Sequence, residues 1–198
     1  TWRRLFAKLL YGEAFRAPKP WDYTDGQGNP SLAPERMRSL ELSTGYVLRD
    51  FLRLEAAGFW NRLNDMLAKE TVPAASGEDW RWTNAGHIST LGLEVGGEAS
   101  VGRFRSFGNY TYTRSRNEEG ITVPEIATHG ANVGAGYHFN ERIRTMVWGQ
   151  YLGARTNPKI IAATGDDRID PAFVLNASLS FLDLGGVDFQ VIVRNALD

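Results

Sequence analysis

Residues 187–194, with the sequence Val-Asp-Phe-Gln-Val-Ile-Val-Arg, decide the fold class of this chain. Every second residue is apolar, and these residues are Val187, Phe189, Val191 and Val193. Polar residues fill three of the intervening positions: Asp188, Gln190 and Arg194. Because successive side chains of a β-strand point to opposite faces, this alternation predicts a strand with one apolar and one polar face.

The same period of two recurs along most of the chain. It is found in residues 40–48, 52–57, 91–95, 131–138, 143–151 and 173–181. Segments 2–14 and 101–115 are less regular but lack the spacing of an amphipathic helix. The chain is therefore predicted to be all-β, with about nine strands.

Composition excludes several classes of protein. The chain has 198 residues, a formal net charge of −1 and no cysteine. These values argue against a basic nucleic-acid-binding surface, a disulfide scaffold and thiol catalysis. Mean hydropathy is −0.33, and no apolar run of transmembrane-helix length occurs. Abundant glycine (21 residues) and aromatic residues (12%) suit a β-protein, including a membrane β-barrel with a polar lumen.

Short and long links alternate between the predicted strands. Short links are expected near 48–51, 96–100, 139–142 and 183–186, and long links near 16–35, 69–81, 115–127 and 155–171. In an antiparallel meander this places all long links at one end. Transmembrane β-barrels have this arrangement, with tight periplasmic turns and long extracellular loops.

An odd number of strands does not fit a complete barrel. Bacterial single-chain barrels have even strand counts, and open sheet edges in lipid leave backbone groups unpaired. We therefore expect the chain to be a fragment of a larger barrel. A soluble β-sandwich is the alternative, and it requires Val187, Phe189, Val191 and Val193 to be buried by a second sheet.

Several segments resemble motifs of one family, the TonB-dependent outer-membrane receptors. They are Tyr11–Pro18 (YGEAFRAP), Gly28–Glu35 (GNPSLAPE), Ser39–Tyr46, Phe59–Leu67 (FWNRLNDML), Gly92–Val95, Val123–Pro124 and Val193–Asp198 (VRNALD). Each motif is weak alone, but seven occur in the family's order over nearly the whole chain. His129 and Asn132 are one or two places away from the family's positions after Val123–Pro124.

The resemblance implies part of a 22-stranded barrel that is filled by a plug domain. Residues 1–198 resemble the C-terminal part of that barrel, without the plug, the TonB-contacting segment or the last strand. This chain alone is therefore not expected to transport a ligand.

Strand parity assigns a lipid face and a lumen face. The apolar face would meet lipid, with an interfacial aromatic girdle formed by Tyr11, Tyr46, Trp60, Tyr110, Tyr112, Tyr137 and Tyr151. The opposite face would carry charged residues toward the plug, for which the candidates are Glu41, Arg53, Glu55, Glu94 and Arg144. The alternative is a hydrated polar lining with ion pairs inside the barrel.

Candidate ligand-binding residues lie in two predicted long loops. Residues 19–28 combine aromatic and charged side chains, and Trp80 and Arg81 do so in the second loop. A guanidinium suits an anionic ferric chelate. The candidates are Arg16, Lys19, Trp21, Tyr23, Trp80 and Arg81; ordinary loop packing is the alternative. Haem receptors of the family carry a histidine between the first two motifs, and this chain has none there.

The resemblance implies a receptor in the bacterial outer membrane. It would take up a nutrient such as a ferric siderophore, using force delivered by the TonB complex through the absent plug. Cobalamin, haem or oligosaccharide uptake, a passive porin and a surface adhesin are the alternatives. We expect no enzymatic activity, cofactor, metal site or nucleic-acid partner, because no catalytic or phosphate-binding motif was found.

Overall fold

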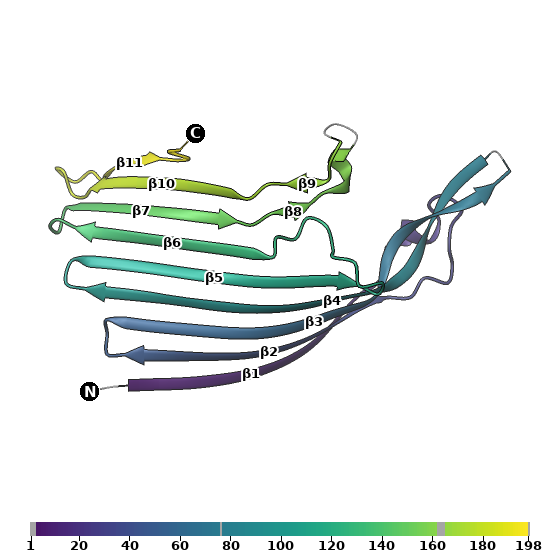
Figure 1. The fold of residues 1–198 in the computed structure, drawn as a ribbon, viewed down its shortest axis with the longest axis horizontal. Coiled ribbons are helices and arrows are strands. Elements are labelled where there is room, and N and C mark those ends of the chain that lie inside the picture. The colour runs from purple at the N-terminus through teal and green to yellow at the C-terminus, as the bar shows by residue number, and fades with distance from the viewer. Residues whose placement is uncertain (1–2, 76, 162–164, 198) are drawn as a thin grey trace.

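A nine-stranded antiparallel sheet makes up most of the protein in the computed structural model, which describes residues 3–75, 77–161 and 165–197 (Figure 1). The strands follow one another in chain order. They are β1 (Arg3–Arg16), β2 (Glu35–Leu48), β3 (Leu52–Ala74), β4 (Gly77–Val101), β5 (Phe104–Asn117), β6 (His129–His138), β7 (Ile143–Leu152), β10 (Ala172–Phe181) and β11 (Phe189–Val193). The predicted all-β meander of about nine strands is confirmed.

Smaller elements lie in the long links. The first link contains the short 3-10 helix η1 (Pro20–Tyr23). The link between β7 and β10 contains β8 (Arg155–Thr156), η2 (Pro158–Ile160) and β9 (Arg168–Ile169), and β8 pairs with β9. No helix in the described part of the chain is long and apolar enough to cross a membrane.

Three of the four predicted long links are observed at one end of the sheet, and the short links lie at the other (Figure 1). The predicted loop at 69–81 is wrong. Residues 66–74 of β3 and 77–85 of β4 continue as a paired hairpin, from Met66 opposite Ala85 to Ala74 opposite Gly77. Its Thr71, Val72, Trp80 and Trp82 favour strands, and cross-strand pairing outweighs the turn signal of Pro73 and Gly77. The turn expected near 96–100 instead lies between Val101 and Phe104.

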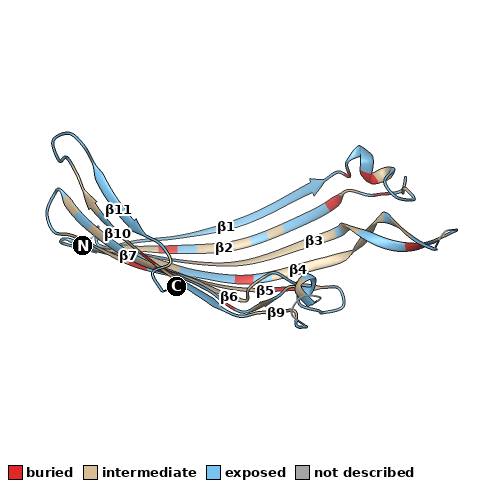
Figure 2. Ribbon diagram, turned by 90° about the horizontal axis from the view of Figure 1, so that it is seen from above, coloured by how far each residue is buried: buried red, intermediate tan, exposed pale blue. Residues whose placement is uncertain are grey.

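Register shows which side chains share a face, because residues directly opposite in an antiparallel pair point the same way. Ala57 pairs with both Ser43 and Glu94, and Glu94 also pairs with Thr111. This polar face lines two hollows in the body of the sheet, so it is the concave face. The sheet is a curved trough whose edge strands, β1 and β11, rise on the same side (Figure 2).

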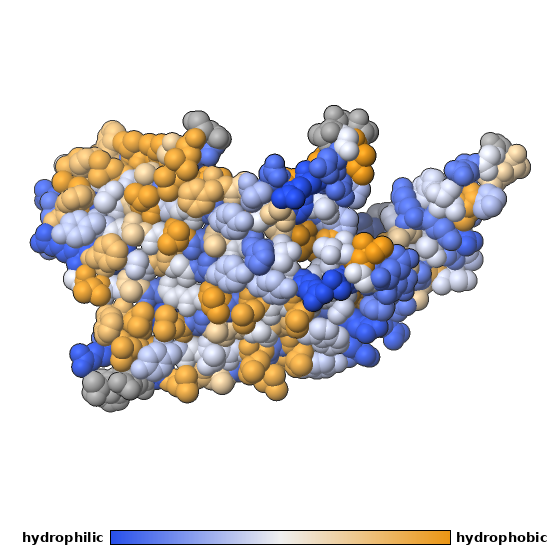
Figure 3. All heavy atoms as spheres, in the orientation of Figure 1, coloured by the Kyte–Doolittle hydropathy of each residue, from blue (hydrophilic) through white to orange (hydrophobic). Residues whose placement is uncertain are grey.

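The convex face is apolar and exposed. Its large side chains include Leu9 (68% exposed), Leu91 (56%), Val133 (59%) and Phe189 (62%). Figure 3 shows apolar residues over the body of the sheet and hydrophilic ones toward the β3–β4 hairpin. The soluble-sandwich alternative is wrong, because Val187, Phe189, Val191 and Val193 are 49–62% exposed instead of buried. Among the described residues, Leu32 and Val72 are the large hydrophobic side chains that are buried.

The seven residues predicted for an aromatic girdle all lie on the convex face. Trp60 pairs with Leu40 and Leu91, and Leu40 also pairs with Tyr11. The indole nitrogen of Trp60 donates to Ser89 Oγ at 3.1 Å. An aromatic ring with an apolar body and one polar atom suits the membrane–water interface.

Aromatic rings cover glycines on the concave face. Phe6, Phe59 and Phe107 lie directly opposite Gly45, Gly92 and Gly134. A Cβ atom on any of these glycines would overlap the facing ring. These pairs bring neighbouring strands together without a gap in the sheet, as aromatic residues do when they cover strand glycines.

Candidate ligand site at the long-loop end of the sheet

The β3–β4 hairpin leaves the plane of the sheet at one position. Asn64 pairs with His87 and Met66 with Ala85, whereas Asp65 and Gly86 between them are not paired. Both residues have positive φ, 56° for Asp65 and 32° for Gly86. Beyond this point the hairpin bends away from the sheet (Figure 1).

The first long link, residues 17–34, packs against this hairpin through its backbone. Gln27 N donates to Trp80 O at 3.0 Å, and Gly26 forms a β-bridge with Arg81. Gly26 has φ of +62°, and a Cβ there would overlap the Trp80 carbonyl, so only glycine fits this approach. Asn29 Nδ2 donates to Trp82 O, also at 3.0 Å.

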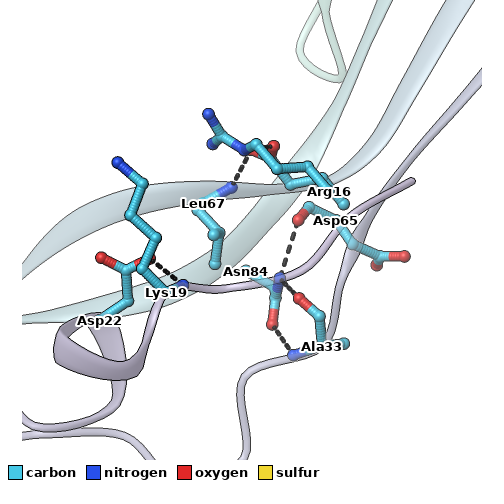
Figure 4. A network of polar contacts seen from close by, with 8 residues as sticks. Arg16, Lys19, Asp22, Ala33, Asp65, Leu67 and Asn84 are labelled. Carbon is cyan, nitrogen blue, oxygen red and sulfur yellow. Dashed lines mark hydrogen bonds and ion pairs between the residues drawn. The ribbon is translucent and has the colours of Figure 1, made fainter. Parts of the chain in front are cut away.

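Two polar side chains join the base of the link to the base of the hairpin (Figure 4). The Asn84 amide accepts from Ala33 N at 2.8 Å and donates to Ala33 O at 2.9 Å and Asp65 O at 2.8 Å. The buried Glu35 carboxylate accepts from Leu67 N at 2.8 Å and pairs with Arg16. Because these groups are satisfied by one another, the loop and the hairpin form one structural unit.

The helix η1 carries Trp21 and Tyr23 of the predicted ligand residues, and Lys19 is its N-cap. Lys19 N donates to the buried Asp22 carboxylate at 2.8 Å, which caps the helix. Trp21 is 55% exposed, and Lys19 Nζ lies 5.4 Å from the centre of its ring. Tyr23 is partly buried, and its carbonyl accepts from Asn29 N at 2.9 Å.

A second aromatic group lies on the hairpin. Trp80 and Trp82 meet edge to face with ring centres 6.0 Å apart, and Lys69 Nζ lies 3.7 Å from the centre of Trp80. Sequence reasoning found Trp80 but missed Lys69 and Trp82. Their proximity depends on the register that places Lys69 opposite Trp82, which could be expected only after the hairpin was recognised as paired strands.

The two arginines among the predicted ligand residues each have an acidic partner. Arg81 pairs with Glu70 at 3.2 Å, and Arg16 pairs with the buried Glu35. The structure therefore brings the segments that carry the six predicted residues together, through hydrogen bonds that Gln27, Asn29, Ala33 and Glu35 make with the hairpin. The ligand role of the six predicted residues stays a prediction.

The five predicted plug-facing residues all lie on the concave face. Glu41, Glu55 and Glu94 line one hollow of about 560 Å³. Arg144 lines a second of about 430 Å³ together with Arg105 and His138. Arg53 and Glu55 pair with each other at 2.5 Å, which favours the alternative of ion pairs inside the barrel for these two residues.

In residues 3–75, 77–161 and 165–197, no group of three or more His, Asp or Glu side chains could hold a metal ion. The Tyr110 hydroxyl lies 2.7 Å from His129 Nδ1, so this histidine already has a polar partner.

A curved meander with an exposed apolar convex face and a polar concave face defines part of a transmembrane β-barrel. The sequence model of the family described as "TonB dependent receptor-like, beta-barrel" matches residues 2–196. The chain belongs to this family, as the sequence motifs predicted. No curated protein sequence matches the chain.

Solved structures with the same fold include several receptors and transporters. A mutant of the ferric enterobactin receptor PfeA from Pseudomonas aeruginosa is 17% identical, with a TM-score of 0.82 over 98% of this chain and 33% of that one. The siderophore receptor PirA from Acinetobacter baumannii is 15% identical, with a TM-score of 0.79 over 98% and 35%. The copper transporter OprC is 17% identical, with a TM-score of 0.73 over 98% and 31%. The chain thus spans about a third of the length of these proteins.

Proposed function

We propose that this chain is the C-terminal part of the barrel of an outer-membrane receptor that actively takes up a chelated metal, most simply a ferric siderophore. The observation that carries the proposal is the family match over residues 2–196. The folded unit of loop 17–34 and the β3–β4 hairpin adds a structured surface at the end where extracellular ligands arrive. The ferric enterobactin receptor PfeA and the siderophore receptor PirA share the fold.

Additional strands complete the barrel in this proposal. In the described residues β1 pairs only with β2, and β11 only with β10. Unpaired strand edges are costly in a bilayer, so further strands would pair with both edges. Residues 1–198 are then one part of the barrel domain, with the long-loop end outside the cell.

Ligand chemistry is argued from the exposed side chains. Trp21, Trp80 and Trp82 offer flat apolar surface. The ammonium group of Lys19 lies over Trp21, and that of Lys69 lies over Trp80 and Trp82. A ferric chelate with an aromatic, anionic ligand shell can stack on indole and pair with ammonium. Arg16 and Arg81 contribute less charge because each is paired with a glutamate.

The concave face would contact the plug. Glu41 and Glu94 form no ion pair among the described residues and point into the same hollow as Glu55. Basic plug residues could pair with them in a hydrated setting, where each pair contributes about 0–1 kcal/mol. Such weak pairs would hold a plug that must still move when the TonB complex pulls on it.

Ligand uptake by the full-length receptor tests this function. Tryptophan fluorescence and uptake of radioactive iron would be measured with ferric enterobactin and ferrichrome, with cobalamin and maltohexaose as probes of the alternatives. Saturable quenching by a ferric siderophore, with uptake that stops when the TonB complex is deleted, is the expected result. Uptake that continues without the TonB complex would instead identify a passive porin.

A further inference from the structure

The convex face changes character abruptly where the strands approach the long loops. On β2 the apolar residues end at Leu40, and Arg38 and Arg36 follow on the same face. On β3 Trp60 is followed by Arg62, and on β5 Tyr112 is followed by Arg114 and Arg116. The end of the convex face toward the hairpin is accordingly hydrophilic (Figure 3).

Strand register places several of these residues in one row across the sheet. Glu13 pairs with Arg38, Arg38 with Arg62, Arg62 with Ser89, and Ser89 with Arg116. Arg36 lies two residues beyond this row on β2, and Arg114 two residues before it on β5. We call the set of five arginines the arginine row: Arg36, Arg38, Arg62, Arg114 and Arg116.

Depth in the membrane follows from the length of the apolar band. On β2 this band runs from Leu48 to Leu40, which is about 27 Å along the strand, or about 21 Å across a bilayer at a tilt near 40°. This is close to the band of about 25 Å that faces lipid in such barrels. Arg38 lies two residues further, about 7 Å along the strand, so the row sits at the depth of the lipid headgroups.

Most guanidinium groups of the arginine row have no acidic partner in the described residues. Of the five arginines, only Arg38 forms an ion pair in the described residues, with Glu13 at 3.1 Å. Arg62 Nε donates to the neutral Asn64 amide at 3.0 Å. Arg38 and Arg62 are directly opposite each other, and like charges in that position destabilise a sheet. A bound anion would remove this repulsion.

Arginine favours phosphate as that anion, because the planar guanidinium can donate two parallel hydrogen bonds to phosphate oxygens. A cavity of about 400 Å³ lies at the β1–β2 end of the row and is lined by Glu13, Phe15, Arg36 and Arg38, among others. The exposed Phe15 ring next to two guanidinium groups suits an amphiphile that has both a phosphate and an acyl chain. Free phosphate would use only the arginines.

We propose that the arginine row binds the phosphate groups of lipids in the outer leaflet of the membrane. The proposal rests on the barrel spanning the membrane with its long loops outside, but not on which nutrient the receptor takes up. Bound lipid would offset the repulsion between neighbouring arginines and fix the barrel's depth in the bilayer.

The test uses the full-length receptor purified in mild detergent. Binding of lipid A, phosphate-free lipid A, dioleoylphosphatidylcholine and inorganic phosphate would be measured by native mass spectrometry. The triple variant R38Q/R62Q/R116Q is compared with the control R49Q/R103Q/R142Q, which removes the same charge from the short turns. We expect lipid A affinity to fall at least tenfold in the row variant and less than twofold in the control.

Other outcomes show whether the bound phosphate belongs to a lipid or is free in solution. Lipid A binding that is equal with and without its phosphates, or equal losses in both variants, would overturn the proposal. If millimolar inorganic phosphate displaces all the lipid, the row is a site for free anions, and this result would also overturn the proposal. If the triple variant does not show the heat-modifiable mobility of a folded barrel, R62Q and R116Q are measured singly, each with an expected loss of at least threefold. Ferric siderophore binding should persist in these variants, so a failure here is distinct from a failure of the proposed function.

Discussion

Asp65 and Gly86 face each other at the one unpaired position inside the β3–β4 ladder, and both have positive φ. This pair marks the point where the hairpin leaves the sheet and carries Lys69, Trp80 and Trp82 toward loop 17–34. Non-glycine residues rarely adopt such a backbone, and holding one there costs about 1–3 kcal/mol.

Replacing Gly86 by valine should destabilise the bend by about 1–3 kcal/mol, because a β-branched residue disfavours positive φ. The added side chain would also meet the Glu118 carboxylate. The expected result is faster tryptic cleavage of the intact receptor after Lys69 or Arg81. Gly58→Ala is the matched control, since a Cβ at Gly58 meets nothing closer than Gly92 O at 4.0 Å. Equal cleavage rates in the two variants would contradict this account of the bend.

Glu35 ties the loop to the hairpin, so Glu35→Ala should loosen the hairpin base. The Leu67 N–H loses its acceptor, which costs about 1–3 kcal/mol where it stays shielded from water. Arg16 is 65% exposed and can return to solvent, so its lost pairing adds little. Hydrogen exchange at the Leu67 amide should accelerate by about tenfold or more. Glu41→Ala on the concave face is the control and should leave this amide unchanged.

Alternation of side chains along the sequence is enough to predict the two faces of the sheet. It places Glu41, Glu55 and Glu94 on one face and Trp60 on the other, and the register confirms both placements. The reason is physical: the period of a strand is two, so a single apolar stripe fixes the orientation of every side chain along it.

Residues 69–81 show where this reasoning fails. Lys69, Glu70, Pro73 and Gly77 have the composition of a loop. Pairing of Lys69 with Trp82 and Thr71 with Trp80 holds the hairpin together instead. These pairs depend on the register across the hairpin, which the sequence alone does not show, so it does not predict the position of Lys69 over Trp80. Aspartate adopts positive φ more readily than most residues, but the sequence does not show that Asp65 does so.

Glu41 and Glu94 test the weak coupling proposed between barrel and plug. E41Q/E94Q should change the rate of ferric siderophore uptake by less than about fivefold per residue, since hydrated ion pairs contribute about 0–1 kcal/mol each. Raising the salt concentration should reduce the difference between this variant and the parent protein, because exposed charges are screened. Complete loss of uptake in folded protein would show that these carboxylates do more than pair weakly with the plug.

Lys69 provides the most direct test of ligand chemistry at the hairpin. Its ammonium group lies 3.7 Å from the centre of Trp80 and 5.4 Å from that of Trp82, so it adds positive charge to an aromatic surface. Lys69→Met keeps the length of the side chain and removes the charge, and the affinity for an anionic ferric siderophore should fall about tenfold, or about 1.4 kcal/mol. Lys69→Arg should restore most of it. Lys159→Met, in another long link and 3.4 Å from Glu125, is the control, with an expected change below twofold. Quenching titrations of the full-length receptor measure all three variants, and equal affinities for K69M and K159M would place the ligand away from this hairpin.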